Sequence, residues 1–177
     1  MKLGYALCGS FCTHAKSIAV LEELVKIHTV VPIISENVAR TDTRFGKAAD
    51  TIALLESLCS RKPIMSIAEA EPLGPAEPLD MLVIAPCTGN TLAKLSHGIT
   101  DTTVTMAAKA HLRADRPLLI ALATNDALSA NLENIARLRS RKHIHFVPMT
   151  QDDPLGKPHS LVADFEKIPA EIVRIMG

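Results

Sequence analysis

The stretch "MLVIAPCTGNTLAKL", residues 81–95, joins an apolar run to a helical pattern through a turn of small polar residues. All five residues of "MLVIA" are apolar, as in a strand that is covered on both faces of a parallel sheet. Leu92, Leu95 and Ile99 then follow at helical spacing. The stretch therefore predicts a strand that passes through a polar turn directly into a helix.

The same alternation recurs along the whole chain. Strands are predicted at residues 2–8, 29–35, 81–85, 116–124 and 143–149. Helices are predicted at residues 13–27, 43–58, 92–99, 104–112, 128–138 and 161–176, the last of them broken or restarted at Pro169. Segment 61–80 holds four prolines and is expected to be an ordered excursion without regular structure. The alternation predicts an α/β fold of three layers, Rossmann-like, with a mainly parallel sheet flanked by helices.

Length and composition narrow the class of protein. A chain of 177 residues suits one domain, and we expect residues 1–177 to form it. Nineteen basic and nineteen acidic residues cancel, so the charge footprint of a nucleic-acid binder is missing. The apolar run at the N-terminus is too short for a signal sequence or a membrane span, which predicts a cytoplasmic protein without membrane contact.

Cysteine and histidine spacing argues against a metal site. The four cysteines include no C-x-x-C pair, and the seven histidines form no cluster with carboxylates at ligand spacing. We therefore expect reduced thiols and no metal. Cys87, at a strand end, is either a nucleophile or a buried thiol beneath a ligand, and no base adjacent in the sequence supports the first reading.

Small, polar and largely uncharged turns stand at the ends of four of the predicted strands. They are Gly9-Ser10, Ser35-Glu36-Asn37, the turn 86–91, and Thr124-Asn125-Asp126. In an open parallel sheet these strand ends meet where ligands bind, and such turns suit a phosphate on helix N-termini. The same residue types also cap helices without any ligand. Neither G-x-G-x-x-G nor a P-loop motif is present, so a dinucleotide fingerprint and a triphosphatase are not indicated.

These turns resemble the cofactor motifs of the homo-oligomeric flavin-containing cysteine decarboxylase superfamily. The resemblance rests on "PCTGNT", residues 86–91, and on Gly9-Ser10. A longer set of segments is similar to one family within it, the flavoprotein-type (B) subunits of dipicolinate synthase. These segments are "TDTRFG" (41–46), "AEPLGP" (70–75), "IAPCTGNTLAKL" (84–95), "GITDTTVTMAAKAHLR" (98–113), "TNDALSANLENIARL" (124–138) and "FVPMTQDDPLGKPHSLV" (146–162).

The resemblance implies a flavoprotein fold with FMN as cofactor and a homo-oligomer based on trimers. It also implies a partner, the Rossmann-type dehydrogenase (A) subunit of dipicolinate synthase, with which the chain oxidises dihydrodipicolinate or a hydrated precursor to dipicolinic acid during sporulation, in the mother-cell cytoplasm. The phosphate would be met mainly by helix N-termini and hydroxyls. The implied cofactor residues are Gly9, Ser10, Ser35, Thr88, Gly89, Asn90, Thr91, Thr124 and Asn125.

The chain also departs from the superfamily's decarboxylases. It has no histidine between His28 and His97, where they carry a catalytic one, and "LATNDALSAN" stands in place of their substrate clamp. Thr124 replaces an arginine of the related prenyltransferases. Two other functions stay open, a non-catalytic assembly subunit with an empty flavin pocket and a stand-alone decarboxylase or prenyltransferase. Candidates for binding a dicarboxylate substrate are Lys109, Arg113, Lys157 and His159.

Overall fold

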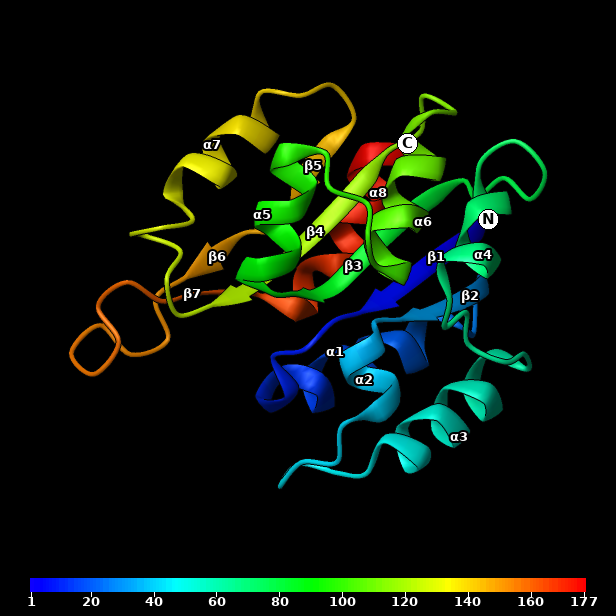
Figure 1. Cartoon of the computed structure of the whole chain (residues 1–177), viewed down its shortest axis with the longest axis horizontal. Coiled ribbons are helices and arrows are strands. Elements are labelled where there is room, and N and C mark those ends of the chain that lie inside the picture. Colours follow the sequence, from blue (N-terminus) through cyan, green and yellow to red (C-terminus); the bar gives the residue numbers. More distant parts are fainter.

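A seven-stranded sheet forms the centre of the computed structural model, which describes all residues 1–177 (Figure 1). Its strands are β1 (Lys2–Leu7), β2 (Thr29–Ile34), β3 (Met81–Cys87), β4 (Leu118–Thr124), β5 (Ile144–Phe146), β6 (Met149–Thr150) and β7 (Leu161–Ala163). The strand order is β2-β1-β3-β4-β7-β6, and β5 also pairs with β4. Strands β1 to β5 pair in parallel, whereas β7 is antiparallel to β4 and β6.

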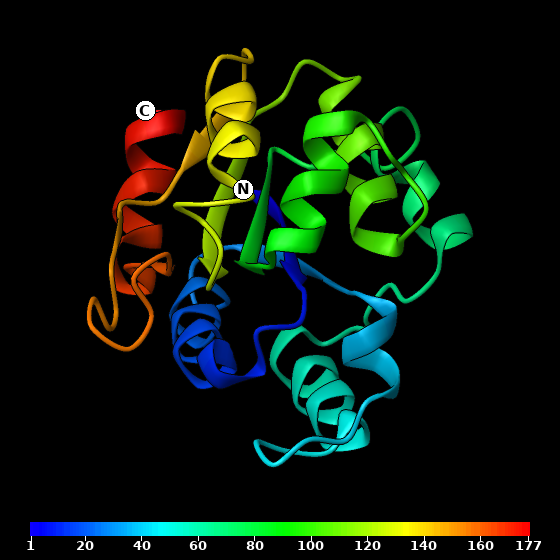
Figure 2. The ribbon, with the colours of Figure 1, turned by 60° about the vertical axis from the view of Figure 1, so that its left-hand side comes forward.

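Helices cover both faces of the sheet. They are α1 (His14–Leu24), α2 (Glu36–Arg40), α3 (Ala48–Cys59), α4 (Ile67–Ala70), α5 (Gly89–His97), α6 (Thr103–Leu112), α7 (Leu132–Arg139) and α8 (Ile168–Met176), with 3-10 turns η1 (Phe11–Thr13), η2 (Glu71–Leu73) and η3 (Phe165–Lys167). One apolar core joins the sheet to α4, α5, α6 and α7, and the other joins it to α1, α2, α3 and α8. In the turned view, α5 and α6 (green) lie on the opposite side from α1 (blue) and α8 (red) (Figure 2). The predicted α/β class is thus confirmed.

Several predicted elements differ from the structure. The helix expected at 128–138 begins at Leu132, because a turn precedes it in which the N–H groups of Ser129 and Asn131 donate to the carbonyl oxygen of Asp126. The strand expected at 143–149 is divided into β5 and β6.

The helix expected from residue 43 begins at Ala48, because residues 43–46 close a turn in which Thr43 and Gly46 exchange two backbone hydrogen bonds. The helix expected at 161–176 is wrong at its start, where β7 pairs with β4. Segment 61–80 is not devoid of regular structure, since α4 and η2 lie within it.

The strands owe their burial to aliphatic residues. β3 is buried along its whole length, and β4 along all but Thr124. Tyr5, the only tyrosine, is fully buried in β1, and its hydroxyl donates to the carbonyl oxygen of Ser17 at 2.9 Å. No helix is long and apolar enough to cross a bilayer.

The buried side chain of His111 leads us to expect that the stability of the fold depends on pH. The His111 side chain in α6 is fully buried, Nε2–H donates to the carbonyl oxygen of Pro117 at 2.8 Å, and Nδ1 has no partner. Burial lowers the pKa of His111, because a second proton would place a charge in the core. Below the unfolded-state pKa of about 6.5, the unfolded chain takes up a proton that the folded chain resists. We therefore expect the free energy of unfolding to fall with pH, by at most about 1.4 kcal/mol per pH unit from this group.

Urea unfolding at pH 8 and pH 5.5 tests this expectation. The variant His111→Gln, which can still donate to Pro117, should lose less stability on acidification than the unaltered chain. His159→Gln, at an exposed position, is the matched control and should keep the original pH dependence. Equal pH dependence in all three proteins would show that His111 is not responsible.

Candidate functional site

A cavity of about 350 Å³ lies over the carboxyl ends of β1, β3 and β4. These strands are neighbours in the sheet, and the strand order reverses between β1 and β3, where open parallel sheets bind ligands. We call it the strand-end cavity. Its lining residues are Ser10, Cys12, Thr13, Thr88, Gly89, Ala123, Thr124, Asn125, Asp152, Lys157, Ser160 and Val162.

The loop after β1 is fixed to β4 across the cavity. Ser10 has a left-handed backbone conformation, with φ of 58°. Its hydroxyl donates to the carbonyl oxygen of Ala123 at 2.7 Å, and the Thr13 hydroxyl donates to the carbonyl oxygen of Ser10 at 2.8 Å. The loop is therefore held in place by hydrogen bonds that the protein makes with itself.

The N-terminus of α5 forms the floor of the cavity. Thr88 caps this helix, and its hydroxyl oxygen accepts from the backbone N–H of Thr91 at 3.2 Å. The backbone N–H groups of Gly89 and Asn90, in the first turn, have no acceptor within the helix. Thr91 is buried, and its hydroxyl donates to Sγ of Cys8 at 3.3 Å rather than towards the cavity.

A chain of side-chain hydrogen bonds runs from the cavity into the protein. Asp126 accepts from the Thr124 hydroxyl at 2.5 Å and from the Asn131 amide at 2.9 Å. Asn131 accepts from the Asn134 amide at 2.9 Å, and Asn134 accepts from the Ser96 hydroxyl at 2.5 Å. This polar chain joins the end of β4 to α7 and to the last turn of α5.

Gly89 lies where this polar chain meets α5. A Cβ atom added at Gly89 would be 2.6 Å from Thr124 Oγ1, 2.6 Å from Asn131 Nδ2 and 2.8 Å from Asp126 Oδ1. Real Cβ atoms essentially never approach other heavy atoms this closely. Only glycine allows the helix N-terminus to sit against the end of β4 in this way.

The hydroxyl groups of the cavity present lone pairs rather than protons. Five hydroxyl-bearing residues line it, and in this geometry each donates its proton to a protein acceptor; they are Ser10, Thr13, Thr88, Thr124 and Ser160. A phosphate accepts hydrogen bonds and needs donors. The donors that are not committed within the ligand-free protein are the first N–H groups of α5, the Asn125 amide and the remaining N–H groups of Lys157. The expected role of the hydroxyls towards a phosphate stays a prediction.

One ion pair lies on the outer wall of the cavity. Lys157 Nζ is 3.0 Å from Asp152 Oδ2, and the Ser160 hydroxyl donates to Asp152 Oδ1 at 2.6 Å. Hydrogen bonds from Ser160 and Lys157 lower the pKa of Asp152, and the bond to Asp152 raises the pKa of Lys157. The pair is exposed and leaves the cavity without a large net charge.

Two cysteines near the strand-end cavity, Cys8 and Cys87, are poor nucleophiles because of their surroundings. Cys8 and Cys87 are both buried. Burial raises the pKa of the Cys8 thiol to about 11 and the pKa of the Cys87 thiol well above its ordinary value. Since the thiolate is the nucleophile, the buried-thiol interpretation of Cys87 agrees with the geometry.

The structure brings most of the predicted cofactor residues together. Five line the strand-end cavity: Ser10, Thr88, Gly89, Thr124 and Asn125. Gly9, Asn90 and Thr91 flank these residues in the sequence but do not line it, and Ser35 caps α2 on the far side of β1. Of the predicted dicarboxylate contacts, only Lys157 lines it. Asp152 and Ser160 were not predicted, although they lie in the segment that also supplies Lys157.

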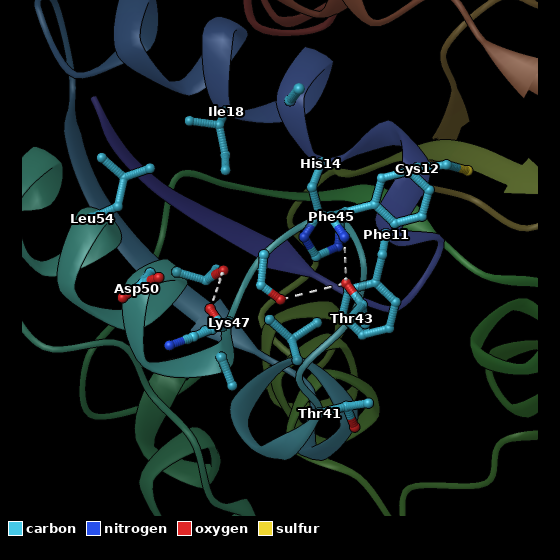
Figure 3. Close-up of a pocket in the computed structure, with 15 residues that line it drawn as sticks. Phe11, Cys12, His14, Ile18, Thr41, Thr43, Phe45, Lys47, Asp50 and Leu54 are labelled. Atoms are coloured by element: carbon cyan, nitrogen blue, oxygen red, sulfur yellow. Dashed lines mark hydrogen bonds between the residues drawn. The ribbon is translucent and has the colours of Figure 1, made fainter.

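A second cavity, of about 320 Å³, opens on the other side of the loop after β1 (Figure 3). We call it the aromatic cavity, because Phe11 and Phe45 line it together with His14 and Lys47. Phe11 and His14 have ring centroids 5.0 Å apart, and Nε2–H of His14 donates to the carbonyl oxygen of Cys8 at 2.9 Å. Cys12 lines both cavities, so the two are neighbours.

Comparison with known proteins places the chain in a family. The chain belongs to the flavoprotein family, whose model matches residues 1–176. It is 45% identical to the B subunit of dipicolinate synthase from Bacillus subtilis (strain 168), over 99% of this chain and 88% of that protein. The resemblance to the flavoprotein-type subunits of dipicolinate synthase is thereby confirmed.

Solved structures agree with this placement. The crystal structure of the B subunit of dipicolinate synthase from Bacillus halodurans superimposes with a TM-score of 0.90 at 40% identity, over 99% of this chain and 90% of that one. The FMN-dependent cysteine decarboxylase SpaF superimposes with a TM-score of 0.71 at 23% identity, over 99% of this chain and 95% of that one. At 23% identity, the similarity to SpaF shows a shared fold.

Proposed function

We propose that this chain is the FMN-binding subunit of a dipicolinate synthase. It acts with the enzyme's dehydrogenase subunit to oxidise dihydrodipicolinate, or its hydrated precursor, to dipicolinic acid. The observation that carries the proposal is the strand-end cavity, which gathers five predicted cofactor residues in a chain 45% identical to a component of that enzyme. The family suggests redox or decarboxylase-type activity, and the proposal chooses the redox one.

The residues of the strand-end cavity fit a flavin mononucleotide. The volume of the cavity, about 350 Å³, is in the range of small-molecule sites. The N-terminus of α5 and Lys157 would hold the phosphate, since helix N-termini attract anions. The hydroxyl oxygens of Ser10 and Thr124 would accept from N–H or O–H groups of the cofactor. The chemistry that FMN supplies when bound is the acceptance of a hydride.

The aromatic cavity is the proposed place of the substrate. Phe11 and Phe45 offer apolar ring surface to a flat dihydropyridine, and Lys47 offers a cation to a carboxylate. Phe45 is 53% exposed, and Arg44 Cζ lies 4.8 Å from its ring centroid, so part of the ring surface is free to meet a ligand. The proposal includes a homo-oligomer built on trimers, which the superfamily resemblance implies.

Stand-alone decarboxylation is not favoured. The loop between α2 and α3, residues 41–47, contains no histidine. His14 is the only histidine that lines the aromatic cavity, and its Nε2 is engaged by the Cys8 carbonyl. A general acid at the position used by the decarboxylases is therefore missing.

Flavin content and reconstituted activity test the proposal. Purified protein should be yellow and should release flavin in near-equal molar amount on denaturation. Oxidation of dihydrodipicolinate should require this chain, FMN and the dehydrogenase subunit together. Colourless protein that cannot be reconstituted with FMN, yet supports full activity of the dehydrogenase, would instead show an assembly subunit. Activity of this chain without the dehydrogenase would show a stand-alone enzyme.

Substitution of Asn90 by aspartate should separate cofactor binding from folding. Asn90 is exposed at the second position of α5, where a carboxylate would repel a phosphate and lower FMN affinity at least about tenfold. The same carboxylate favours the helix by roughly 0.3–1 kcal/mol, so the melting temperature should not fall. FMN fluorescence titration and thermal unfolding give the two readouts.

Asn37→Asp is the matched control for this variant. Asn37 is also exposed and occupies the same second position in α2, away from the strand-end cavity. It should show the same small effect on stability and unchanged FMN affinity. Unchanged FMN affinity in Asn90→Asp would mean that the phosphate does not sit at the N-terminus of α5.

A further inference from the structure

A third cavity, of about 390 Å³, lies at the opposite end of α5 from the strand-end cavity. Nine residues of helix, or about 13 Å, lie between the two ends. We call it the basic cavity, and no residue lines both. Its lining residues are Leu95, Gly98, Ile99, Thr100, Thr105, Lys109, Leu112, Arg113 and Arg141.

Three cations surround the basic cavity without a carboxylate. Lys109 and Arg113 come from the end of α6, and Arg141 from the loop after α7. None of the nine ion pairs of the structure includes them, and no Asp or Glu lines the cavity. Since the chain has no net charge, a cavity with three unpaired cations is a local excess that an anion would neutralise.

Arg141 is held in place before any ligand binds. Its guanidinium donates to the carbonyl oxygens of Leu95 at 3.3 Å and Ser96 at 2.6 Å, at the end of α5. Lys109 and Arg113 lie at the C-terminus of α6, where cations complement the helix dipole, and this position accounts for a basic residue at each site. The same reason applies to Arg141 at the end of α5, so helix dipoles account for each cation separately. A ligand would account for the position of all three around one cavity that is partly apolar.

The cavity also has an apolar surface. Leu95, Ile99 and Leu112 line it, and the side chain of Ile99 is 47% exposed. Inorganic phosphate would satisfy the cations but leave this surface in water. A flat organic ligand that carries two carboxylates would cover the apolar residues and meet the cations at its edges.

We propose that the basic cavity is a second ligand site, which binds a compact aromatic dicarboxylate. Its two carboxylates meet Arg141 on one side and Lys109 with Arg113 on the other, and its ring lies against Leu95 and Leu112. The expected natural ligand is the product class of the proposed reaction, a pyridine dicarboxylate, and this identification rests on the proposed function. The site is separate from both cavities assigned to the cofactor and the substrate.

Calorimetric titration of the full-length protein tests the proposal, in buffer with EDTA so that metal chelation by the probe does not contribute. The probes are pyridine-2,6-dicarboxylate, pyridine-2-carboxylate, succinate and inorganic phosphate. The first should bind at least tenfold more tightly than the other three, because it alone has both a ring and two carboxylates. Equal binding of phosphate would overturn the proposal, since it would show a general anion site.

Variants locate the binding. Lys109→Gln and Arg113→Gln should each weaken pyridine-2,6-dicarboxylate at least fivefold, and the double variant more. Arg139→Gln, an exposed arginine on α7 that does not line the cavity, should leave it unchanged. Arg141→Gln should also weaken binding. Because this variant also loses the hydrogen bonds from Arg141 to the end of α5, its result is interpreted only together with those of the Lys109 and Arg113 variants.

Lys157→Gln distinguishes this site from the strand-end cavity, and Lys47→Gln distinguishes it from the aromatic cavity. Neither variant should change the affinity of the basic cavity for pyridine-2,6-dicarboxylate. If either variant abolishes binding while Lys109→Gln and Arg113→Gln do not, the ligand occupies that other cavity and the proposal fails. The titration needs neither FMN nor the dehydrogenase, so a failure of the proposed function does not decide its outcome.

Discussion

Replacing Gly89 by alanine is expected to lower the free energy of unfolding by roughly 2–4 kcal/mol and to abolish retention of FMN. The added Cβ atom would meet Thr124 Oγ1, Asn131 Nδ2 and Asp126 Oδ1 at 2.6–2.8 Å. Either α5 moves away from the end of β4, or the polar chain breaks. The first outcome displaces the helix N-terminus that forms the floor of the strand-end cavity, and the second disturbs Thr124, which lines the cavity.

Urea unfolding and the flavin released from purified protein measure the two effects. Gly9→Ala is the control for stability, because its Cβ would contact only the Thr88 methyl, at 3.3 Å. We expect Gly9→Ala to cost below about 1 kcal/mol. If Gly89→Ala is as stable as the unaltered chain, α5 does not depend on this close approach.

Replacing Asp126 by alanine is expected to cost roughly 2–3 kcal/mol of stability. The Asp126 carboxylate is the shared acceptor of the Thr124 hydroxyl and the Asn131 amide, and Asn131 is 5% exposed. Without the Asp126 carboxylate, the buried side-chain NH2 group of Asn131 has lost its acceptor. The Thr124 hydroxyl also becomes free to turn its proton into the strand-end cavity, so the affinity for FMN should change as well.

Asp101→Ala is the matched control, because it also removes an aspartate that has a side-chain partner, but at the surface and outside the polar chain. Asp101 is exposed and pairs with Lys94 at 2.8 Å, and ion pairs at such exposed positions contribute little to stability because water screens them. Denaturant unfolding should therefore rank Asp126→Ala well below Asp101→Ala in stability. A cost for Asp126→Ala no larger than for Asp101→Ala would mean that the polar chain does not stabilise the fold.

The sequence predicted the central part of the fold because its signals there are local. Strands β1, β2, β3 and β4 are continuous apolar runs, and the helices that cover them carry apolar residues at helical spacing. β7 was missed because its three residues become a strand by pairing with β6 and with Ala123 and Thr124 of β4, which lie far away in the sequence. Nothing in the sequence around residues 161–163 distinguishes this pairing from the start of a helix.

The candidate site could be predicted at the strand ends but not beyond them. Parallel strands bring their carboxyl ends to one edge, so Ser10, Thr88 and Thr124 could be placed together from the pattern alone. The direction of each hydroxyl proton depends on acceptors such as the Ala123 carbonyl, which only the fold brings near. The basic cavity could not be predicted either, since Arg141 reaches Leu95 across 46 residues of sequence.

The segment after β6 completes the strand-end cavity. Asp152, Lys157 and Ser160 form its outer wall, and β7 closes against the end of β4 beside it. All other lining residues except Val162 of β7 lie at or before Asn125, so during synthesis on the ribosome the cavity stays open until residues 150–163 have emerged and paired. If FMN binds in this cavity as proposed, its retention depends on this late segment, and a protein truncated before β7 should lose affinity for FMN.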